Sequence, residues 1–314
     1  MSDNLFWAGK KVLVTGGGGF IGSFVVDNLV NRRRVNSADI RVPRSRDIDL
    51  RFFANCQRAV DGCDVVIHLA AATGGIAFTR THPAQQYYES TMIDLNIIEA
   101  ARQTNVSKFV AVGNLFAYAA SAPSPLREEY LFDGLPTDAH RSVGWMKRNL
   151  ALVADLYYRE YQFPMVVVYT ANAYGPRDSL DPVLSHVIPA TIMKCFREQE
   201  LVVWGDGSPT RDFLFVEDVA EGLVLAAEKL DPPNYVNIGS GKEISVRELV
   251  IQIAHYADFK GSIVFDVSKS GGDARRCTSV DRAKALMGFQ PQVPMEAGLQ
   301  RTVEWYRSQL ARKA

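Results

Sequence analysis

Short runs of apolar residues alternate with longer amphipathic stretches over the first half of the chain. The apolar runs have the length of buried strands and occupy residues 12–14, 65–67, 109–112 and 165–168. The stretches between them repeat their apolar positions with helical spacing, most clearly over residues 21–29, 92–101 and 150–158. This alternation predicts βαβ units and a parallel sheet that is covered by helices on both faces.

The pattern changes after about residue 174, where prolines, glycines and short elements become frequent. A helical pattern returns over residues 216–229, and a last amphipathic helix is predicted over residues 296–310. We therefore predict an α/β protein with a Rossmann-type doubly wound parallel sheet and a smaller C-terminal lobe. The sheet domain is expected to comprise residues 1–173 and a return segment of about 213–238, and the lobe residues 174–212 and 239–314.

Composition narrows the class of protein. Hydrophobic residues make up 47% of the 314 residues and charged residues 22%, and 35 basic residues balance 35 acidic ones. A net charge of zero argues against nucleic acid or an anionic membrane as the main partner, because neither would be attracted at long range. The four cysteines are scattered without metal-binding spacing and indicate reduced thiols. Since we find no secretory signal and no apolar run of membrane-spanning length, we expect a cytoplasmic protein.

A glycine-rich turn follows the first predicted strand directly. Glycine at Gly16, Gly19 and Gly22 allows a tight turn, a close approach of the backbone to a pyrophosphate, and packing of the next helix on the strand. The helix that starts near Phe20 and Ile21 would present its free N–H groups to the anion. This strand–turn–helix segment predicts a binding site for a nicotinamide dinucleotide.

The end of the second predicted strand bears on which dinucleotide is preferred. An acidic residue there holds the ribose hydroxyls of NAD, whereas arginine accommodates the 2′-phosphate of NADP. This strand is followed by Arg44 and Arg46, and no carboxylate occurs before Asp47. Guanidinium groups suit phosphate recognition, so the sequence favours NADP. The alternative is a solvated loop and a site that accepts either cofactor, NAD included.

Five segments carry a resemblance to a known family. They are residues 44–50, residues 66–71 followed by 74–76, and residues 172–178, 185–190 and 204–214. On these segments the chain resembles the extended short-chain dehydrogenase/reductases of the NAD-dependent epimerase/dehydratase family, and within them the branch that includes GDP-L-fucose synthase. The resemblance implies that a nucleotide-diphosphate sugar binds between the sheet domain and a substrate-binding lobe. It also implies a homodimer that packs through the helices around residues 87–102 and 143–158.

The same resemblance assigns residues to both ligands. Arg211 would contact the nucleotide diphosphate, and Trp204, Lys194 and Arg276 would line the same pocket. For Lys194 and Arg276, an ordinary surface charge is an equal alternative. Asp49 and Leu50 would lie beside the adenine. The full set of implied cofactor contacts is Gly16, Gly19, Gly22, Arg44, Asp49, Leu50, Ala70 and Lys147.

The catalytic pattern departs from that of the family. The family uses a tyrosine four residues before a lysine on one helix, and the lysine also holds the nicotinamide ribose. Lys147 has the place of that lysine, but Val143 stands where the tyrosine is expected. Asn114 stands in the position of a strand-end serine or threonine, and Phe116 in that of an epimerase cysteine. His186 keeps the place of the other epimerisation acid/base.

Three functions fit this pattern. The one that the sequence favours, narrowly, is an enzyme that acts on a GDP-linked keto sugar by epimerase-type proton abstraction with NADP(H) bound. His186 would be its base, and Lys147 and Asn114 are the other candidate catalytic residues. The second function is a reductase whose proton donor has moved to His140 or Tyr118. The third is a non-catalytic protein that binds NADP and a nucleotide sugar.

Overall fold

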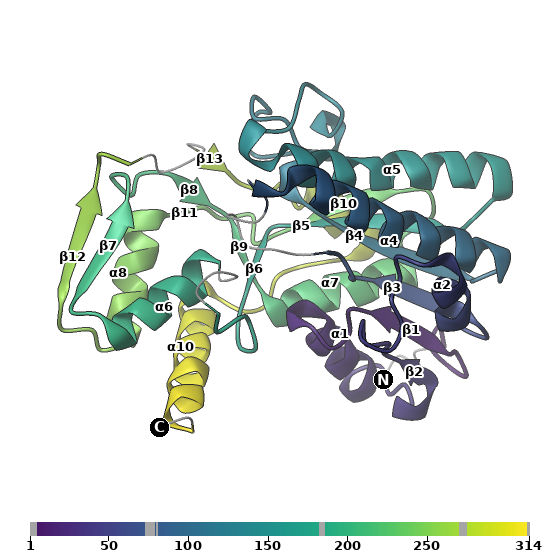
Figure 1. Ribbon diagram of the computed structural model, residues 1–314, viewed down its shortest axis with the longest axis horizontal. Coiled ribbons are helices and arrows are strands. Elements are labelled where there is room, and N and C mark those ends of the chain that lie inside the picture. The colour runs from purple at the N-terminus through teal and green to yellow at the C-terminus, as the bar shows by residue number, and fades with distance from the viewer. Residues whose placement is uncertain (1–4, 73–78, 80, 182–185, 270–274, 313–314) are drawn as a thin grey trace.

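The computed structural model describes residues 5–72, 79, 81–181, 186–269 and 275–312 (Figure 1). At its centre is a six-stranded sheet in the order β10–β5–β4–β3–β1–β2, in which every neighbouring pair is parallel. The strands are β1 (Val12–Thr15), β2 (Ile40–Arg41), β3 (Val65–His68), β4 (Lys108–Asn114), β5 (Met165–Thr170) and β10 (Tyr235–Ile238). Every residue of β1, β3 and β5 is buried, as expected for a parallel sheet with both faces covered.

Helices cover both faces of this sheet (Figure 1). On one face α1 (Phe20–Asn31) packs against α7 (Val216–Lys229). The other face carries α2 (Phe53–Val60), α4 (Pro83–Gln103) and α5 (Arg141–Tyr161). This arrangement confirms the predicted doubly wound α/β fold. None of the helices in the described part of the chain is both long and apolar enough to cross a membrane.

The strand order indicates where a ligand would bind. β1 has β2 on one side and β3 on the other, so the direction of winding reverses between β1 and β3. Open α/β sheets bind ligands outside the carboxyl ends of their strands at such a switch point. The last residues of these two strands, Thr15 and His68, are register partners. The glycine turn after Thr15 and the segment after His68 therefore frame the expected dinucleotide site.

A smaller lobe with its own hydrophobic core follows the main sheet (Figure 1). It contains three small sheets, β11–β8–β13, β12–β7 and β6–β9. The strands are β6 (Asn172–Tyr174), β7 (Glu200–Trp204), β8 (Thr210–Arg211), β9 (Phe213–Phe215), β11 (Ile244–Ser245), β12 (Ser262–Asp266) and β13 (Arg275–Arg276). The helices are α6 (Val187–Arg197), α8 (Val246–Tyr256) and α10 (Met295–Ala311). Between β9 and β11 the chain returns to the main sheet, where β10 pairs with β5.

Three shorter helices lie between these elements. η2 (Leu115–Ala117) continues from the end of β4, and η4 (Asp138–His140) leads directly into α5. α9 (Asp281–Met287) contacts α7 and β10. η2 and η4 bring the residues that follow β4 and the residues that precede α5 to the same end of the sheet.

Candidate active site

The turn between β1 and α1 packs directly on the end of β3. Gly16 has a φ of +67°, and a Cβ at this position would lie 3.0 Å from the amide nitrogen of Ala70. Both the backbone conformation and the close contact therefore require glycine. Gly19 is the N-cap of α1, and no side chain caps this end of the helix. A Cβ at Gly22 would lie 2.2 Å from the carbonyl oxygen of Gly16, which fixes the packing of α1 on the turn.

The arginine that follows β2 lies across this turn. A Cβ at Gly18 would lie 1.6 Å from Nη1 of Arg44, so the guanidinium group covers an exposed glycine. Phe20 and Ile21 form the first turn of α1, whose amides have no intrahelical acceptor. Free amides and a guanidinium group together suit a phosphate. Arg46, in contrast, is 84% exposed and pairs with the residue next to it.

The two residues expected beside the adenine already have protein partners. Oδ2 of Asp49 accepts a hydrogen bond from Nη2 of Arg51 at 2.7 Å, and this interaction lowers the pKa of the carboxyl group. Leu50 is buried in the core of the sheet domain. The structure thus ties Asp49 to Arg51 and gives the Leu50 side chain a packing role.

Several side chains that differ from the family pattern lie together where β4 ends. Oδ1 of Asn114 accepts a hydrogen bond from the amide of Phe116 at 3.1 Å, which leaves Nδ2 as the donor of this side chain. The ring of Phe116 stacks on that of His140, with centroids 3.8 Å apart and planes 7° apart. Arg276 reaches the same place from β13 and donates to the carbonyl oxygen of Leu115 at 2.8 Å. Sequence reasoning missed this contact, which joins the smaller lobe to the end of β4.

The N-terminal half of α5 carries Val143 and Lys147 one turn apart on one face. Val143 is half-buried, and the side chain of Lys147 is 11% exposed. Nζ of Lys147 lies 3.7 Å from Oδ2 of Asp94, and its carbonyl oxygen accepts a hydrogen bond from the hydroxyl of Tyr169 at 3.0 Å. Valine neither donates nor accepts a proton, so the position where a phenol is expected holds only an apolar side chain.

Tyr118 cannot serve as the relocated proton donor. Its side chain is fully buried, and its hydroxyl donates to Oδ1 of Asn237 at 2.7 Å. Burial raises its pKa well above the ordinary value. The expectation that Tyr118 could donate a proton is therefore wrong, because its ring is buried in the core. Its position in the sequence, close to Asn114, does not reveal this burial.

His186 has a carboxylate partner that sequence analysis did not assign. Its Nδ1 lies 3.2 Å from Oδ2 of Asp178. The Asp178 side chain is 5% exposed, whereas that of His186 is 72% exposed. The hydrogen bond to Asp178 raises the pKa of His186 above its ordinary value. An exposed imidazole that is oriented by a buried carboxylate is a suitable general base.

The residues predicted to line the pocket of the nucleotide diphosphate lie in two groups in the smaller lobe. Arg211 and Arg276 are register partners on β8 and β13. Lys194 of α6 is half-buried and donates to a carbonyl oxygen of β7, and Trp204 is the last residue of that strand. The indole of Trp204 is exposed, and the ammonium group of Lys269 lies 5.1 Å from its ring centroid. Arg276 is buried, so the alternative of an ordinary surface charge is wrong for this residue.

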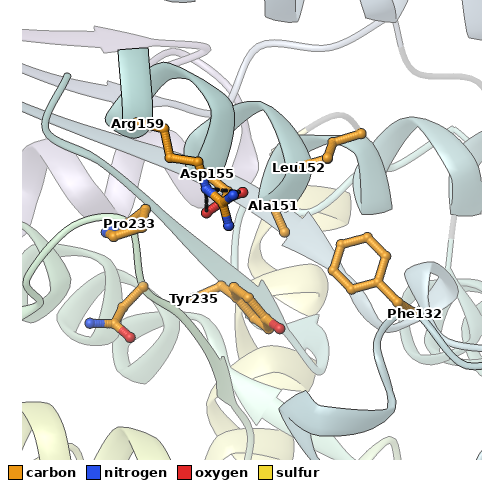
Figure 2. Close-up of a pocket in the computed structure, with 8 residues that line it drawn as sticks. Phe132, Ala151, Leu152, Asp155, Arg159, Pro233 and Tyr235 are labelled. Carbon is orange, nitrogen blue, oxygen red and sulfur yellow. Dashed lines mark hydrogen bonds and ion pairs between the residues drawn. The ribbon is translucent and has the colours of Figure 1, made fainter. Parts of the chain in front are cut away.

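A hollow of about 340 Å³ lies elsewhere, between α5 and β10 (Figure 2). Phe132, Leu152 and Tyr235 line it, together with the hydrogen-bonded pair Asp155 and Arg159. Because Tyr235 is the first residue of β10, this hollow lies toward the amino ends of the strands. Ligands of open α/β sheets bind at the carboxyl ends, where the glycine turn lies. The hollow is therefore not the candidate site.

Comparisons with known proteins found a matching family, similar sequences and a similar solved structure. Residues 12–239 match the NAD dependent epimerase/dehydratase family. The chain is 32% identical to a GDP-L-fucose synthase of Sinorhizobium fredii, over 96% of this chain and 97% of that protein. It is 33% identical to a GDP-L-fucose synthase of Escherichia coli, over 95% of this chain and 96% of that protein. A solved GDP-L-fucose synthetase from Naegleria fowleri bound to NADP is similar with a TM-score of 0.87 at 25% identity, over 96% of this chain and 93% of that one.

Proposed function

Because this chain belongs to the NAD dependent epimerase/dehydratase family, we propose that it binds NADP(H) and modifies a nucleotide-linked keto sugar. A GDP-linked sugar is favoured, since relatives named GDP-L-fucose synthase align with almost the whole chain. The position of Arg44 over Gly18 supports NADP, because a guanidinium group on this turn suits a 2′-phosphate; NAD is the alternative. When bound, the nicotinamide supplies hydride transfer between a ketone and an alcohol.

The reaction we propose is proton transfer at the carbon next to the ketone, with His186 as the base. The observation that carries it is the hydrogen bond between Nδ1 of His186 and the buried carboxylate of Asp178. Since Nδ1–H donates to Asp178, the lone pair of Nε2 is left to take the proton. The electrons of the broken C–H bond form an enolate. A water molecule on the opposite face gives a proton to the same carbon, which inverts it and restores the ketone, and the hydroxide that is left is neutralised by the proton that His186 releases. No electrons are exchanged with the nicotinamide in this sequence.

Asn114 and Lys147 are proposed to stabilise the oxygen of the enolate. Oδ1 of Asn114 is taken by the amide of Phe116, so its Nδ2 group is the one that can donate to a ligand. Lys147 adds a positive charge from α5. Donors that are held in place before the negative charge forms lower the barrier to forming it. His186 comes from the smaller lobe and the other two from the sheet domain, so a sugar bound between them would contact both.

A second function, ketone reduction, is supported by the stack of His140 on Phe116. This stack places an imidazole beside the end of β4, next to the residue that holds the Asn114 side chain. In this alternative, His140 would give a proton to the ketone oxygen during reduction, in place of the missing phenol. Tyr118 is excluded from that role by its burial.

We also propose a homodimer formed through α4 and α5. These helices expose large apolar side chains, with Tyr88 65% exposed on α4, and Leu152 and Leu156 45% and 51% exposed on α5. Sedimentation velocity should show a dimer for the wild type and a monomer for Leu156→Lys. Ile251→Lys, at an equally exposed apolar position on α8, is the matched control and should leave the dimer intact.

Isotope exchange in deuterated water tests the proposed reaction. GDP-4-keto-6-deoxymannose is incubated with the protein and NADPH, deuterium at the two carbons beside the ketone is followed by proton NMR, and NADPH is followed by its absorbance. We expect exchange without stoichiometric NADPH oxidation. The rate of exchange in His186→Asn should be lower than that of the wild type by a factor of about 100 or more. His255→Asn, on the exposed side of α8, is the matched control and should keep the wild-type rate.

Each outcome separates the candidate functions. Unchanged exchange in His186→Asn would exclude this histidine as the base. NADPH oxidation that is lost in His140→Phe and kept in His186→Asn would favour the reductase. Tight binding of NADPH and the nucleotide sugar, with neither exchange nor oxidation, would indicate a binding protein.

A further inference from the structure

A line of buried polar side chains joins the glycine turn to Lys147. Oγ1 of Thr15 lies 2.7 Å from Nδ1 of His68, and Nε2 of His68 lies 2.9 Å from Oδ1 of Asp94. Oδ2 of Asp94 lies 3.7 Å from Nζ of Lys147. Thr15, His68 and Asp94 are at most 3% exposed, so water does not compensate their polar groups. The four residues come from β1, β3, α4 and α5, and the line crosses the sheet domain.

The donors and acceptors along this line can be assigned. Oγ1 of Thr15 accepts hydrogen bonds from the backbone amides of Leu69 and Ala70, both at 3.2 Å, and these occupy its two lone pairs. The Leu69 amide also donates to the carbonyl oxygen of Thr15 at 3.2 Å. The hydroxyl proton of Thr15 therefore goes to Nδ1 of His68, which leaves the proton of the neutral ring on Nε2. Nε2–H donates to Oδ1 of Asp94. His68 is thus a fixed donor to the carboxylate and has no lone pair left for catalysis.

The other oxygen of Asp94 is left for Lys147. In the described part of the chain, Oδ2 is buried and makes no hydrogen bond, and the ammonium group of Lys147 is the cation paired with it. The Lys147 side chain is itself only 11% exposed. A buried carboxylate oxygen without a partner is unfavourable unless a nearby cation compensates its charge. Asp94 and Lys147 therefore hold each other in place across the contact between α4 and α5.

We propose that Asp94 is a positioning residue for Lys147 in cofactor binding. The inference rests on the proposed binding of NADP(H), and it adds that Lys147, besides facing the enolate oxygen, contacts the bound dinucleotide. Val143 has no hydroxyl that could accept a hydrogen bond from the ammonium group of Lys147. The ion pair with Asp94 is therefore the interaction that orients the Lys147 side chain. The other end of the line is also at the cofactor site, since Thr15 precedes Gly16 directly. The same buried groups thus connect the turn that would bind the pyrophosphate with the lysine.

A double-mutant cycle on NADPH affinity tests this role. Dissociation constants are measured by fluorescence titration for the wild type, Asp94→Asn, Lys147→Met and the double variant. We expect each single change to weaken binding about tenfold, and the double variant to bind no more weakly than Lys147→Met alone. Thr91→Val is the matched control, because it is isosteric, lies on α4, and removes a buried hydroxyl that makes no hydrogen bond to any residue the structure describes. It should leave the dissociation constant unchanged.

A second measurement needs no cofactor. The rate of acetylation of Lys147 is determined by mass spectrometry in the cofactor-free protein at mildly alkaline pH, since the reagent attacks only an unpaired neutral amine. Asp94→Asn should raise this rate about fivefold relative to the exposed Lys284, because the ion pair is lost. The rate at the buried Lys108 should stay unchanged, which would show that the variant is folded.

The two measurements separate the ways in which the inference can fail. Additive losses of NADPH affinity, or wild-type acetylation of Lys147 in folded Asp94→Asn, would show that Asp94 does not position the lysine. An unchanged dissociation constant in Lys147→Met would instead show that Lys147 does not contact the cofactor. In that case the acetylation rate still decides whether Asp94 holds Lys147.

Discussion

Asp178 and His186 form a pair in which the acid is buried and the base is exposed. Oδ2 of Asp178 and Nδ1 of His186 are 3.2 Å apart, and the two side chains are 5% and 72% exposed. The backbone amide of Ser179 also donates to the other oxygen of Asp178, at 2.7 Å, so the carboxylate is held from its own loop. This arrangement fixes one nitrogen of the imidazole and leaves most of the ring open to a ligand.

Replacing Asp178 with asparagine should make His186 a weaker base. The carboxylate raises the pKa of His186 above 6.5 by stabilising the imidazolium, and a neutral amide does so much less. We expect the pKa of His186 to fall and isotope exchange at neutral pH to slow about tenfold or more. The pKa is measured from the Cε1 proton resonance of His186, with His255 as the internal control. An unchanged His186 titration in Asp178→Asn would contradict the assigned pair.

The same pair should make stability depend on pH in one direction. Because the folded-state pKa of His186 is raised, the stabilisation is fully present below the unfolded-state pKa and is lost as the pH rises through the folded-state pKa. The difference in unfolding free energy between the wild type and His186→Asn should therefore shrink as the pH rises through that value. The exposed imidazole is screened by solvent, so we expect a small difference. Urea unfolding over a series of pH values measures it, and a difference that grows with pH would contradict the pair.

Val143→Tyr should restore ketone reduction if the rest of the site is ready for hydride transfer. Residue 143 is one helical turn before Lys147 on α5, so the new phenol would lie on the same face as the ammonium group. With a nucleotide-linked keto sugar, we expect NADPH oxidation to rise about 100-fold. Val143→Phe is the matched control, because it adds the ring without the hydroxyl. An equal rise in both variants would show that ring volume, and not proton donation, is responsible.

Local sequence patterns predicted the fold because strand and helix periods are local properties. The predicted helix over residues 216–229 coincides with α7. In contrast, the helical pattern over residues 150–158 covers only the second half of α5. The first turns of α5 pack through Gly144, where a Cβ would lie 2.5 Å from the carbonyl oxygen of Phe116. A helix turn that packs through glycine has no apolar side chain at that position. The pattern of apolar residues therefore did not predict the start of α5.

The partners of the candidate catalytic residues could not be predicted in the same way. The sequence placed Lys147 and His186 by motif, but their partners Asp94 and Asp178 come from other segments, which only the fold brings close. Burial is equally hidden, and it overturned the role expected for Tyr118. Sequence motifs thus identified the residues expected to contact a ligand. They did not identify the buried residues that orient them.

Arg44→Ala should weaken NADPH binding selectively. The guanidinium group lies over Gly18, where it can reach a phosphate on the adenosine ribose, whereas NADH has no such phosphate. We expect the dissociation constant of NADPH to rise about tenfold or more, and that of NADH to change much less. Arg46→Ala removes a neighbouring exposed arginine that pairs with Asp47, and both constants should stay near wild type. Equal losses for both dinucleotides in Arg44→Ala would contradict a 2′-phosphate contact.

The end of α1 is tied to α7 by one arginine and two carboxylates. Nη2 of Arg33 donates to Oε1 of Glu221 at 2.7 Å, and its Nε donates to Oε1 of Glu228 at 2.9 Å. The three side chains are between 10% and 21% exposed. Burial alone would raise the pKa of Glu221, but the hydrogen bonds from Arg33 and Asn28 outweigh it and lower the pKa. The stabilisation from Glu221 is therefore present above the ordinary glutamate pKa and is lost as the pH falls through the folded-state value.

Arg33→Met should be one of the more destabilising changes far from the candidate site. Methionine keeps an unbranched side chain but removes the buried guanidinium group that both Glu221 and Glu228 face, and breaking a largely buried ion pair of this kind costs about 3 to 5 kcal/mol. Urea unfolding at neutral pH should show a loss of this size, and the loss should shrink at acid pH, where the carboxyl groups are protonated. Arg32→Ala removes a 57% exposed arginine that lies 3.4 Å from Glu221 and should cost less than about 1 kcal/mol. The two losses should differ because exposed ion pairs contribute little, whereas the loss of a buried cation leaves buried carboxylates with weaker compensation. Equal losses in the two variants would show that burial does not distinguish these arginines.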